Sequence, residues 1–218
     1  MTRKNTVATV ATIIVALLAL GAAFFLLYKM SEDQARENDY VYVPSAQINA
    51  EMNDNAIRLV KNNCEIFRVF LQYGLSYEPE PYNNLPEDGF YSVKSDKYAS
   101  MADLEKLVKT TFVEKEANRI LENANGNGAV FSEETREDGS TGIGLSMNMV
   151  DNNGHFKGIA YDYSWTNPKV LLRPVSNTEC DIEIELEREN KDNGGNPAKL
   201  TATMIKANGN WYLQRLTY

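Results

Sequence analysis

The segment Val7–Tyr28 constrains this chain more than any other feature. It contains 22 residues, none of which is charged, and twelve of them are Val, Ile, Leu or Phe. A helix of this length rises about 33 Å, which is enough to cross a hydrocarbon core of about 30 Å. We therefore expect residues 1–30 to form a short cytoplasmic tail and a transmembrane anchor, residues 31–44 an acidic stalk, and residues 45–218 a separate domain.

The residues that flank this segment predict on which side of the membrane the domain lies. Arg3 and Lys4 precede the segment, whereas Lys29 and Arg36 follow it among several acidic residues. Basic flanks stay in the cytoplasm, and acidic residues contribute little to orientation. Each side carries two basic residues, so the count alone does not decide the orientation. The N-terminal tail is very short and its basic pair lies nearest the start, and both features favour a single-pass protein with an extracytoplasmic C-terminal domain.

Small residues inside the segment leave a cleaved signal peptide as the second interpretation. Ala19-Leu20-Gly21 and Gly21-Ala22-Ala23 both resemble signal-peptidase sites. Cleavage there would leave Phe24–Tyr28 as a bare apolar end, whereas a signal peptide has its small-residue site directly after a single apolar region. We therefore expect an uncleaved signal anchor.

The charge balance excludes some classes of partner. The chain has 22 Lys and Arg residues against 30 Asp and Glu residues. Without Arg3 and Lys4, 20 basic and 30 acidic residues remain, so the part beyond the anchor carries a net charge of about −10. A domain of this charge repels nucleic acid and anionic lipid. We expect no nucleic-acid partner, and a basic protein is the better electrostatic match.

Residues with reactive side chains are few, and their spacing predicts neither a catalytic nor a metal site. His155 is the single histidine and has no neighbour at a metal-ligand spacing. Pairing of Cys64 with Cys180 would stabilise the fold by about 4–5 kcal/mol, but Cys64 falls on the apolar face of a predicted helix, where a free thiol packs well. Gly142-Ile-Gly144 lies inside a strand pattern, which indicates close backbone approach rather than a phosphate loop. We expect free thiols and no metal or cofactor.

Hydrophobic periodicity predicts helices in the first half of the domain. Ser45 is placed to cap a helix that runs to Gly74, with apolar residues three and four positions apart. After a short strand at Gly89–Val93, the capping box Ser100–Asp103 begins a second helix. A third helix ends at Asn125-Gly126.

From Ala129 onward the apolar period changes to two, which predicts an antiparallel sheet. Cys180, Ile182, Ile184 and Leu186 alternate with acidic residues, so one face is expected in the core and an acidic face in water. Turns are expected at 151–154, 167–168, 193–196 and 208–209. The predicted strands are Ala129–Phe131, Gly142–Val150, Lys157–Trp165, Lys169–Val175, Glu179–Glu187, Lys199–Lys206 and Asn210–Thr217. The predicted fold class is α+β, with helices packed on an antiparallel meander.

One segment, residues 89–144, resembles a known family. In it Phe90-Tyr91 precedes the helix capped by Ser100, Phe112 follows near the helix end, and a loop leads to Asp138-Gly139-Ser140. This order resembles the DL-endopeptidase inhibitor family of Gram-positive bacteria, which are secreted, non-enzymatic proteins that bind NlpC/P60-type cell-wall hydrolases and restrain autolysis. The uncleaved anchor departs from that family, whose members usually carry a cleavable signal.

The resemblance implies a binding protein, not an enzyme, that inhibits or regulates a peptidoglycan DL-endopeptidase of basic charge. We expect the partner-binding residues among the aromatic and polar side chains of this region, namely Tyr91, Tyr98, Glu133, Glu134, Glu137, Asp138 and Ser140. Helices followed by a curved sheet also occur in cystatin-like and nuclear-transport-factor-2-like domains. A non-catalytic ligand-binding or scaffold domain of a cell-envelope assembly is therefore the alternative.

Overall fold

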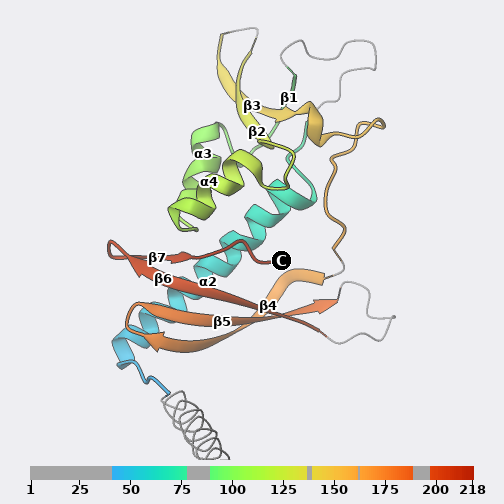
Figure 1. The fold of residues 1–218 in the computed structure, drawn as a ribbon. Coiled ribbons are helices and arrows are strands. Elements are labelled where there is room, and N and C mark those ends of the chain that lie inside the picture. The colour runs from blue at the N-terminus through green and yellow to red at the C-terminus, as the bar shows by residue number, and fades with distance from the viewer. Residues whose placement is uncertain (1–40, 78–88, 137–138, 162, 189–196) are drawn as a thin grey trace, which may run out of the picture. The chain divides into compact units, whose positions relative to one another are not determined.

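The computed structural model describes residues 41–77, 89–136, 139–161, 163–188 and 197–218 (Figure 1). Pro44–Tyr218 forms one compact unit. The expected anchor at 7–28, stalk residues 31–40 and the turn at 193–196 lie outside the described residues. Within the described ranges, none of the helices has the length and apolar character needed to span a membrane.

The longest helix, α2 (Ala46–Phe67), confirms the first predicted helix. The Ser45 side chain accepts a hydrogen bond from the backbone N–H of Ile48 at 3.4 Å and so caps its start. The helix continues as a π-helical turn, Arg68–Gln72, and the left-handed Gly74 follows at φ +71°. Its buried face carries the predicted apolar stripe, with one polar member: Met52, Ala56, Leu59, Val60, Asn63, Ile66 and Phe67.

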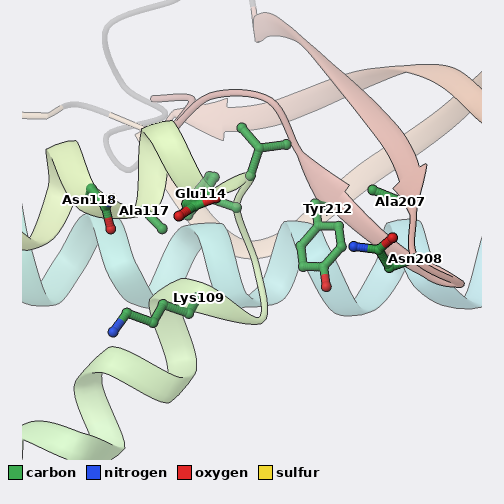
Figure 2. A pocket seen from close by; sticks show the side chains of 9 residues that line it. Lys109, Glu114, Ala117, Asn118, Ala207, Asn208 and Tyr212 are labelled. Atoms are coloured by element: carbon green, nitrogen blue, oxygen red, sulfur yellow. The ribbon is translucent and has the colours of Figure 1, made fainter.

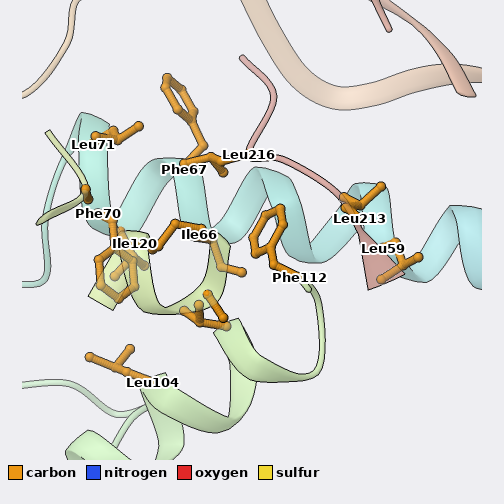
Figure 3. Close-up of a cluster of buried hydrophobic side chains, with 14 of the residues drawn as sticks. Leu59, Ile66, Phe67, Phe70, Leu71, Leu104, Phe112, Ile120, Leu213 and Leu216 are labelled. Carbon is orange, nitrogen blue, oxygen red and sulfur yellow. The ribbon is translucent and has the colours of Figure 1, made fainter. Parts of the chain in front are cut away.

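Two shorter helices follow, and both were predicted. α3 (Met101–Lys109) begins with the expected capping box, in which the Asp103 carboxylate accepts from the backbone N–H of Ser100 at 3.0 Å. α4 (Glu114–Asn123) is followed by Gly126 at φ +86°, a conformation that favours glycine. Figure 3 shows Leu104 from α3 and Ile120 from α4 beside the apolar face of α2.

The strands form two antiparallel sheets, whereas the sequence predicted one meander. The first has the order β1-β3-β2, and the second has the order β4-β5-β6-β7. The strands are β1 (Phe90–Ser92), β2 (Phe131–Thr135), β3 (Thr141–Ser146), β4 (Tyr163–Ser176), β5 (Glu179–Arg188), β6 (Ala198–Ala207) and β7 (Asn210–Leu213). Period-two patterning cannot show which strands share a sheet, because each strand satisfies it alone.

Several predicted strand and turn boundaries are wrong. Residues 157–161 form no strand; instead, the backbone N–H of Ile159 donates to the Leu71 carbonyl at 2.7 Å, which holds this segment against the end of the helical region. Asn167-Pro168 is not a turn but lies inside β4, where the pairing with β5 shifts between Ser164 and Lys169. Proline is common both in turns and at strand bulges, so composition does not separate the two.

Other boundaries also differ from the prediction. β3 ends at Ser146, and a 3₁₀ turn, Met147–Met149, takes the place of the predicted strand end. β7 ends at Leu213 rather than Thr217. The turns at 151–154 and 208–209 are confirmed, the second with φ +50° at Asn208 and +81° at Gly209. Positive φ at both positions is the signature of a type I′ hairpin turn.

β5 has the predicted core face, but its opposite face is not simply acidic. Cys180, Ile182, Ile184 and Leu186 are fully buried. On the outer face, Lys169 of β4 pairs with Glu185 at 2.6 Å. Glu183 pairs with Arg173 of β4 at 2.7 Å and with Lys199 of β6 at 3.3 Å. The cations come from the neighbouring strands, so the sequence of β5 alone overstates the negative charge of this face.

The core is continuous along α2 (Figure 3). Ile66, Phe67 and Phe70 of the helical region are fully buried, as is Leu213 of β7. The ring of Phe70 meets that of Phe131 on β2 edge to face, with centroids 5.3 Å apart. Side chains of α2 and its π-helical extension therefore reach both sheets, which explains why this helix carries the longest apolar stripe among the described helices.

Candidate functional site

The two tyrosines predicted to contact a partner are buried. Tyr91 on β1 is 8% exposed and Tyr98 is 7% exposed. The Tyr98 hydroxyl donates to Glu65 Oε1 at 2.8 Å, and burial together with this bond raises the pKa of Tyr98. Both side chains support the framework and offer little surface to another molecule.

The predicted polar residues gather on the hairpin formed by β2 and β3. Glu133 and Ser140 are exposed there, and Glu134 is half-buried. The backbone N–H of Arg136 donates to the Ser140 carbonyl at 2.8 Å, which closes the hairpin beyond the Thr135–Thr141 pair. Glu137 and Asp138 lie outside the described residues. The structure thus brings part of the predicted acidic set onto one hairpin and separates it from the buried tyrosines.

Gly142 and Gly144 on β3 permit close approach, as predicted. A Cβ atom at Gly142 would lie 2.6 Å from the guanidinium of Arg136. One at Gly144 would lie 2.9 Å from Cβ of Phe90 on β1. These glycines therefore serve packing within the three-stranded sheet.

The reactive side chains are not activated. Cys64 and Cys180 are free thiols, as expected. Burial raises the pKa of Cys64 to about 11 and also raises that of Cys180, so both stay protonated at neutral pH. His155 lies in the turn with its side chain 78% exposed, and its backbone N–H donates to Asp151 Oδ1 at 2.9 Å. In the described part of the chain, no three His, Cys, Asp or Glu residues gather closely enough to hold a metal ion.

A groove between α2 and β4 was missed by sequence reasoning. Its volume is about 770 Å³. We call it the α2–β4 groove; α2 and its π-helical extension contribute Asn53, Ile57, Val60, Lys61, Cys64, Glu65 and Arg68, and β4 contributes Trp165, Thr166, Asn167, Pro168 and Val170. The helix residues recur three and four positions apart and so share one face. The β4 residues come from the stretch where the pairing with β5 shifts, which no sequence pattern revealed.

Unpaired polar atoms lie beside the α2–β4 groove. Trp165 lines it and is 8% exposed, and its Nε1 atom is buried with no hydrogen-bond partner among the described residues. The Tyr161 hydroxyl is also buried without a hydrogen-bond partner among the described residues, and burial raises the pKa of Tyr161 to about 12. The rings of both residues surround Phe67, with centroids 4.9 Å from Tyr161 and 6.5 Å from Trp165. Buried donors without acceptors are uncommon in native folds.

The α2–β4 groove is electropositive, although the chain as a whole is acidic. Lys61 and Arg68 are exposed on the helix face that lines it. Glu65 lies between them, but its carboxylate already forms an ion pair with Lys97 at 2.7 Å and accepts a hydrogen bond from the Tyr98 hydroxyl at 2.8 Å. Burial opposes ionisation of Glu65, yet these bonds hold its pKa below the usual value. Its charge is thus balanced chiefly by Lys97, with a smaller contribution from Arg68, so the groove keeps an excess of positive charge from Lys61 and Arg68.

A second hollow of about 520 Å³ lies between the α3–α4 connection and the β6–β7 hairpin (Figure 2). Figure 2 shows Lys109, Glu114 and Asn118 on one side and Asn208 and Tyr212 on the other. The Lys109 ammonium already bonds to Glu105 at 2.6 Å. This hollow therefore offers less unused binding chemistry than the α2–β4 groove.

The described residues thus form an α+β domain with two exposed features, the β2–β3 hairpin and the α2–β4 groove. No protein-family model matches the chain, and no curated protein matches it significantly. Its function has to be inferred from the chemistry of these two features.

Proposed function

We propose that this chain is a membrane-tethered, extracytoplasmic binding protein that restrains a peptidoglycan DL-endopeptidase. The observation that carries the proposal is the β2–β3 hairpin, on which Glu133 and Ser140 are exposed. A two-stranded hairpin is narrow enough to enter the substrate groove of a hydrolase and to occlude its catalytic cysteine. The resemblance of residues 89–144 to DL-endopeptidase inhibitors supports the same partner.

The state of the reactive residues supports a role without catalysis. Hydrolysis through a cysteine needs a thiolate with a base in hydrogen-bond reach. Here the pKa of Cys64 is about 11 and Cys180 is fully buried. His155, the one histidine, is bonded through its own turn and not to either thiol. These observations argue against cysteine-based hydrolysis by this chain and support a binding role.

The apolar segment Val7–Tyr28 and its basic N-terminal flank support tethering to a membrane. An anchored inhibitor acts on hydrolases that work close to the membrane. Protease added to cells stripped of their wall should digest residues 41–218 and leave Met1 or Thr2 as the N-terminus. A mature chain that begins near Phe24 would contradict the anchor.

The direct test measures cleavage of purified peptidoglycan by a panel of NlpC/P60-type DL-endopeptidases, with and without residues 41–218. We expect inhibition at micromolar concentration or below. Inhibition should weaken as salt rises, because attraction between an acidic and a basic protein is screened beyond about 10 Å at 0.1 M ionic strength. Absence of binding to every enzyme of the panel would contradict the proposal.

A hairpin variant with fewer charges distinguishes long-range electrostatic attraction, which sets the association rate, from direct contact, which sets the dissociation rate. Replacing Glu133, Glu134, Glu137 and Asp138 by Ser should slow association more than it speeds dissociation, because rim charges act mainly on the encounter rate. The matched control replaces four exposed acidic residues elsewhere, Asp54, Asp96, Glu114 and Glu122, and so changes the net charge equally. Equal effects of the two variants would show that overall charge, and not the hairpin, is recognised.

The α2–β4 groove favours a second candidate function, a non-catalytic ligand-binding or scaffold domain of a cell-envelope assembly. Its apolar wall, two exposed cations and buried indole donor are the mixture that binding pockets present. Loss of hydrolase binding together with retained binding at the groove would select this function.

A further inference from the structure

We propose that the α2–β4 groove binds an extended, acidic peptide segment of a partner protein, and that it recognises carboxylates beside apolar side chains. This inference rests on the binding role of the domain and not on hydrolase inhibition, because the groove and the β2–β3 hairpin share no residue.

The shape and lining of the groove fit apolar side chains. Ile57 is 54% exposed, although it stands on the longest helix of the domain. Val60, Pro168 and Val170 line the same groove. An exposed apolar residue inside a concave surface gains burial when a ligand covers it.

The charges beside this apolar surface select a carboxylate. Lys61 and Arg68 are seven positions apart and so lie roughly 10 Å apart along the helix axis. In the part of the chain that the structure describes, neither forms an ion pair; Arg68 lies over the Tyr73 ring at 5.9 Å and interacts electrostatically with the Glu65 carboxylate. Two cations roughly 10 Å apart are too far apart to bind one small anion together. Their long side chains can instead each reach a different carboxylate of an extended chain, whose alternate residues repeat about every 7 Å.

The indole of Trp165 adds a hydrogen-bond donor to the α2–β4 groove. Its Nε1–H is a donor only, and it is buried without an acceptor in the described structure. A peptide carbonyl or a carboxylate oxygen would satisfy it once the side chains that cover this atom move apart. The exposed residues Thr166 and Asn167 lie beside it on β4 and add further polar contacts at the rim.

The position of β4 favours an extended ligand. β4 is an edge strand of the four-stranded sheet, and among the described residues no strand pairs with its outer side. An edge strand can pair with an extended peptide through its free backbone groups. Pro168 lacks an N–H, so pairing along the part of β4 that lines the groove is interrupted at this residue, and the bound segment is short.

The test observes the indole N–H of Trp165 in the full chain, labelled with ¹⁵N and held in a neutral detergent. The chain has two tryptophans, and Trp211 already donates to Glu51 at 2.9 Å, so its signal serves as an internal reference. The probe is a blocked hexapeptide of alternating Glu and Leu. We expect a saturable downfield shift of the Trp165 signal and an unchanged Trp211 signal. Trp165→Phe assigns the signal.

Charge variants test the recognition. Lys61→Glu and Arg68→Glu should each weaken the hexapeptide at least fivefold. Lys115→Glu, an equal change at an exposed position on α4 outside the groove, should leave its affinity unchanged. A hexapeptide with Gln in place of Glu should bind at least tenfold more weakly.

The proposal is overturned if the hexapeptide leaves the Trp165 signal in place, if the Gln peptide binds equally well, or if Lys115→Glu weakens binding as much as Lys61→Glu. It is also overturned if dodecanoate shifts the signal and the hexapeptide does not, because the groove would then take a fatty acid. Hydrolase inhibition is measured on the same preparation. If the protein binds the hexapeptide but does not inhibit the hydrolase, only the inhibitor function is contradicted. If it inhibits the hydrolase but does not bind the hexapeptide, only this inference is contradicted.

Discussion

Asn63 shows how single buried polar side chains join distant parts of this domain. It lies on the apolar face of α2 and is fully buried. Its Nδ2 donates to the Thr217 carbonyl at 2.6 Å, and its Oδ1 accepts from the Thr217 backbone N–H at 2.9 Å. Both backbone groups of Thr217 are thereby satisfied, and the C-terminal segment is held on the helix.

Replacement of Asn63 by Leu keeps the volume but removes both bonds. We expect a loss of about 1–3 kcal/mol in the free energy of unfolding, because two buried backbone groups lose their partner. Urea denaturation of residues 41–218 measures this. Asn118→Leu, at an exposed position on α4, should change stability little. If the two variants unfold at the same urea concentration, the Asn63 contact is not structural.

Glu51 makes a second connection of this kind and adds a dependence on pH. It accepts hydrogen bonds from Lys206 and Trp211, and these bonds lower the pKa of its carboxyl below the ordinary value of 4.5. A lowered folded pKa stabilises the protein above pH 4.5, and this stabilisation is lost as pH falls through the folded pKa. Glu51→Gln should therefore flatten the fall in thermal midpoint between pH 5 and pH 3, whereas an unchanged fall would exclude Glu51 as a contributor.

At the scale of elements, local signals were predictable and long-range pairings were not. Ser45, the capping box at Ser100 and the Asn208-Gly209 turn act through neighbours in sequence, and the structure confirms each of them. The pairing of β1 with β3 joins residues more than 50 positions apart, and the α2–β4 groove joins residues about 100 positions apart. No alternation or spacing encodes such contacts. The contacts that bury Tyr98 are also long-range, since its hydroxyl bonds to Glu65, 33 positions away.

The β6–β7 hairpin gives the sharpest element-scale prediction. Gly209 has φ +81°, and a Cβ added there would meet no atom within 4 Å. Gly209→Val should destabilise the domain by about 1 kcal/mol or more, through backbone strain alone. Gly89→Val is not a suitable control because Gly89 also has positive φ, whereas Asn208→Gly keeps the turn and should be nearly neutral. Equal midpoints in chemical denaturation for the Val variant and wild type would refute the turn.

At the scale of the whole molecule, the domain combines a shared core with two separate binding features. The core along α2 reaches both sheets, so the hairpin and the groove are presented by one framework. The acidic hairpin suits a basic enzyme, whereas the cationic groove suits an acidic segment. The two proposals together predict that the domain holds a hydrolase and a second protein at the same time.

The central claim is that the β2–β3 hairpin occupies the active-site groove of the hydrolase. Ser140→Cys places a thiol on the exposed hairpin, and under mild oxidation it should form a disulfide with the catalytic cysteine of a bound DL-endopeptidase. The native thiols give a low background, because the pKa of Cys64 is about 11 and Cys180 is fully buried. Asn118→Cys on α4 is the matched control. We predict a mixed disulfide with Ser140→Cys and none with Asn118→Cys; equal cross-linking, or none with either variant, would contradict the claim.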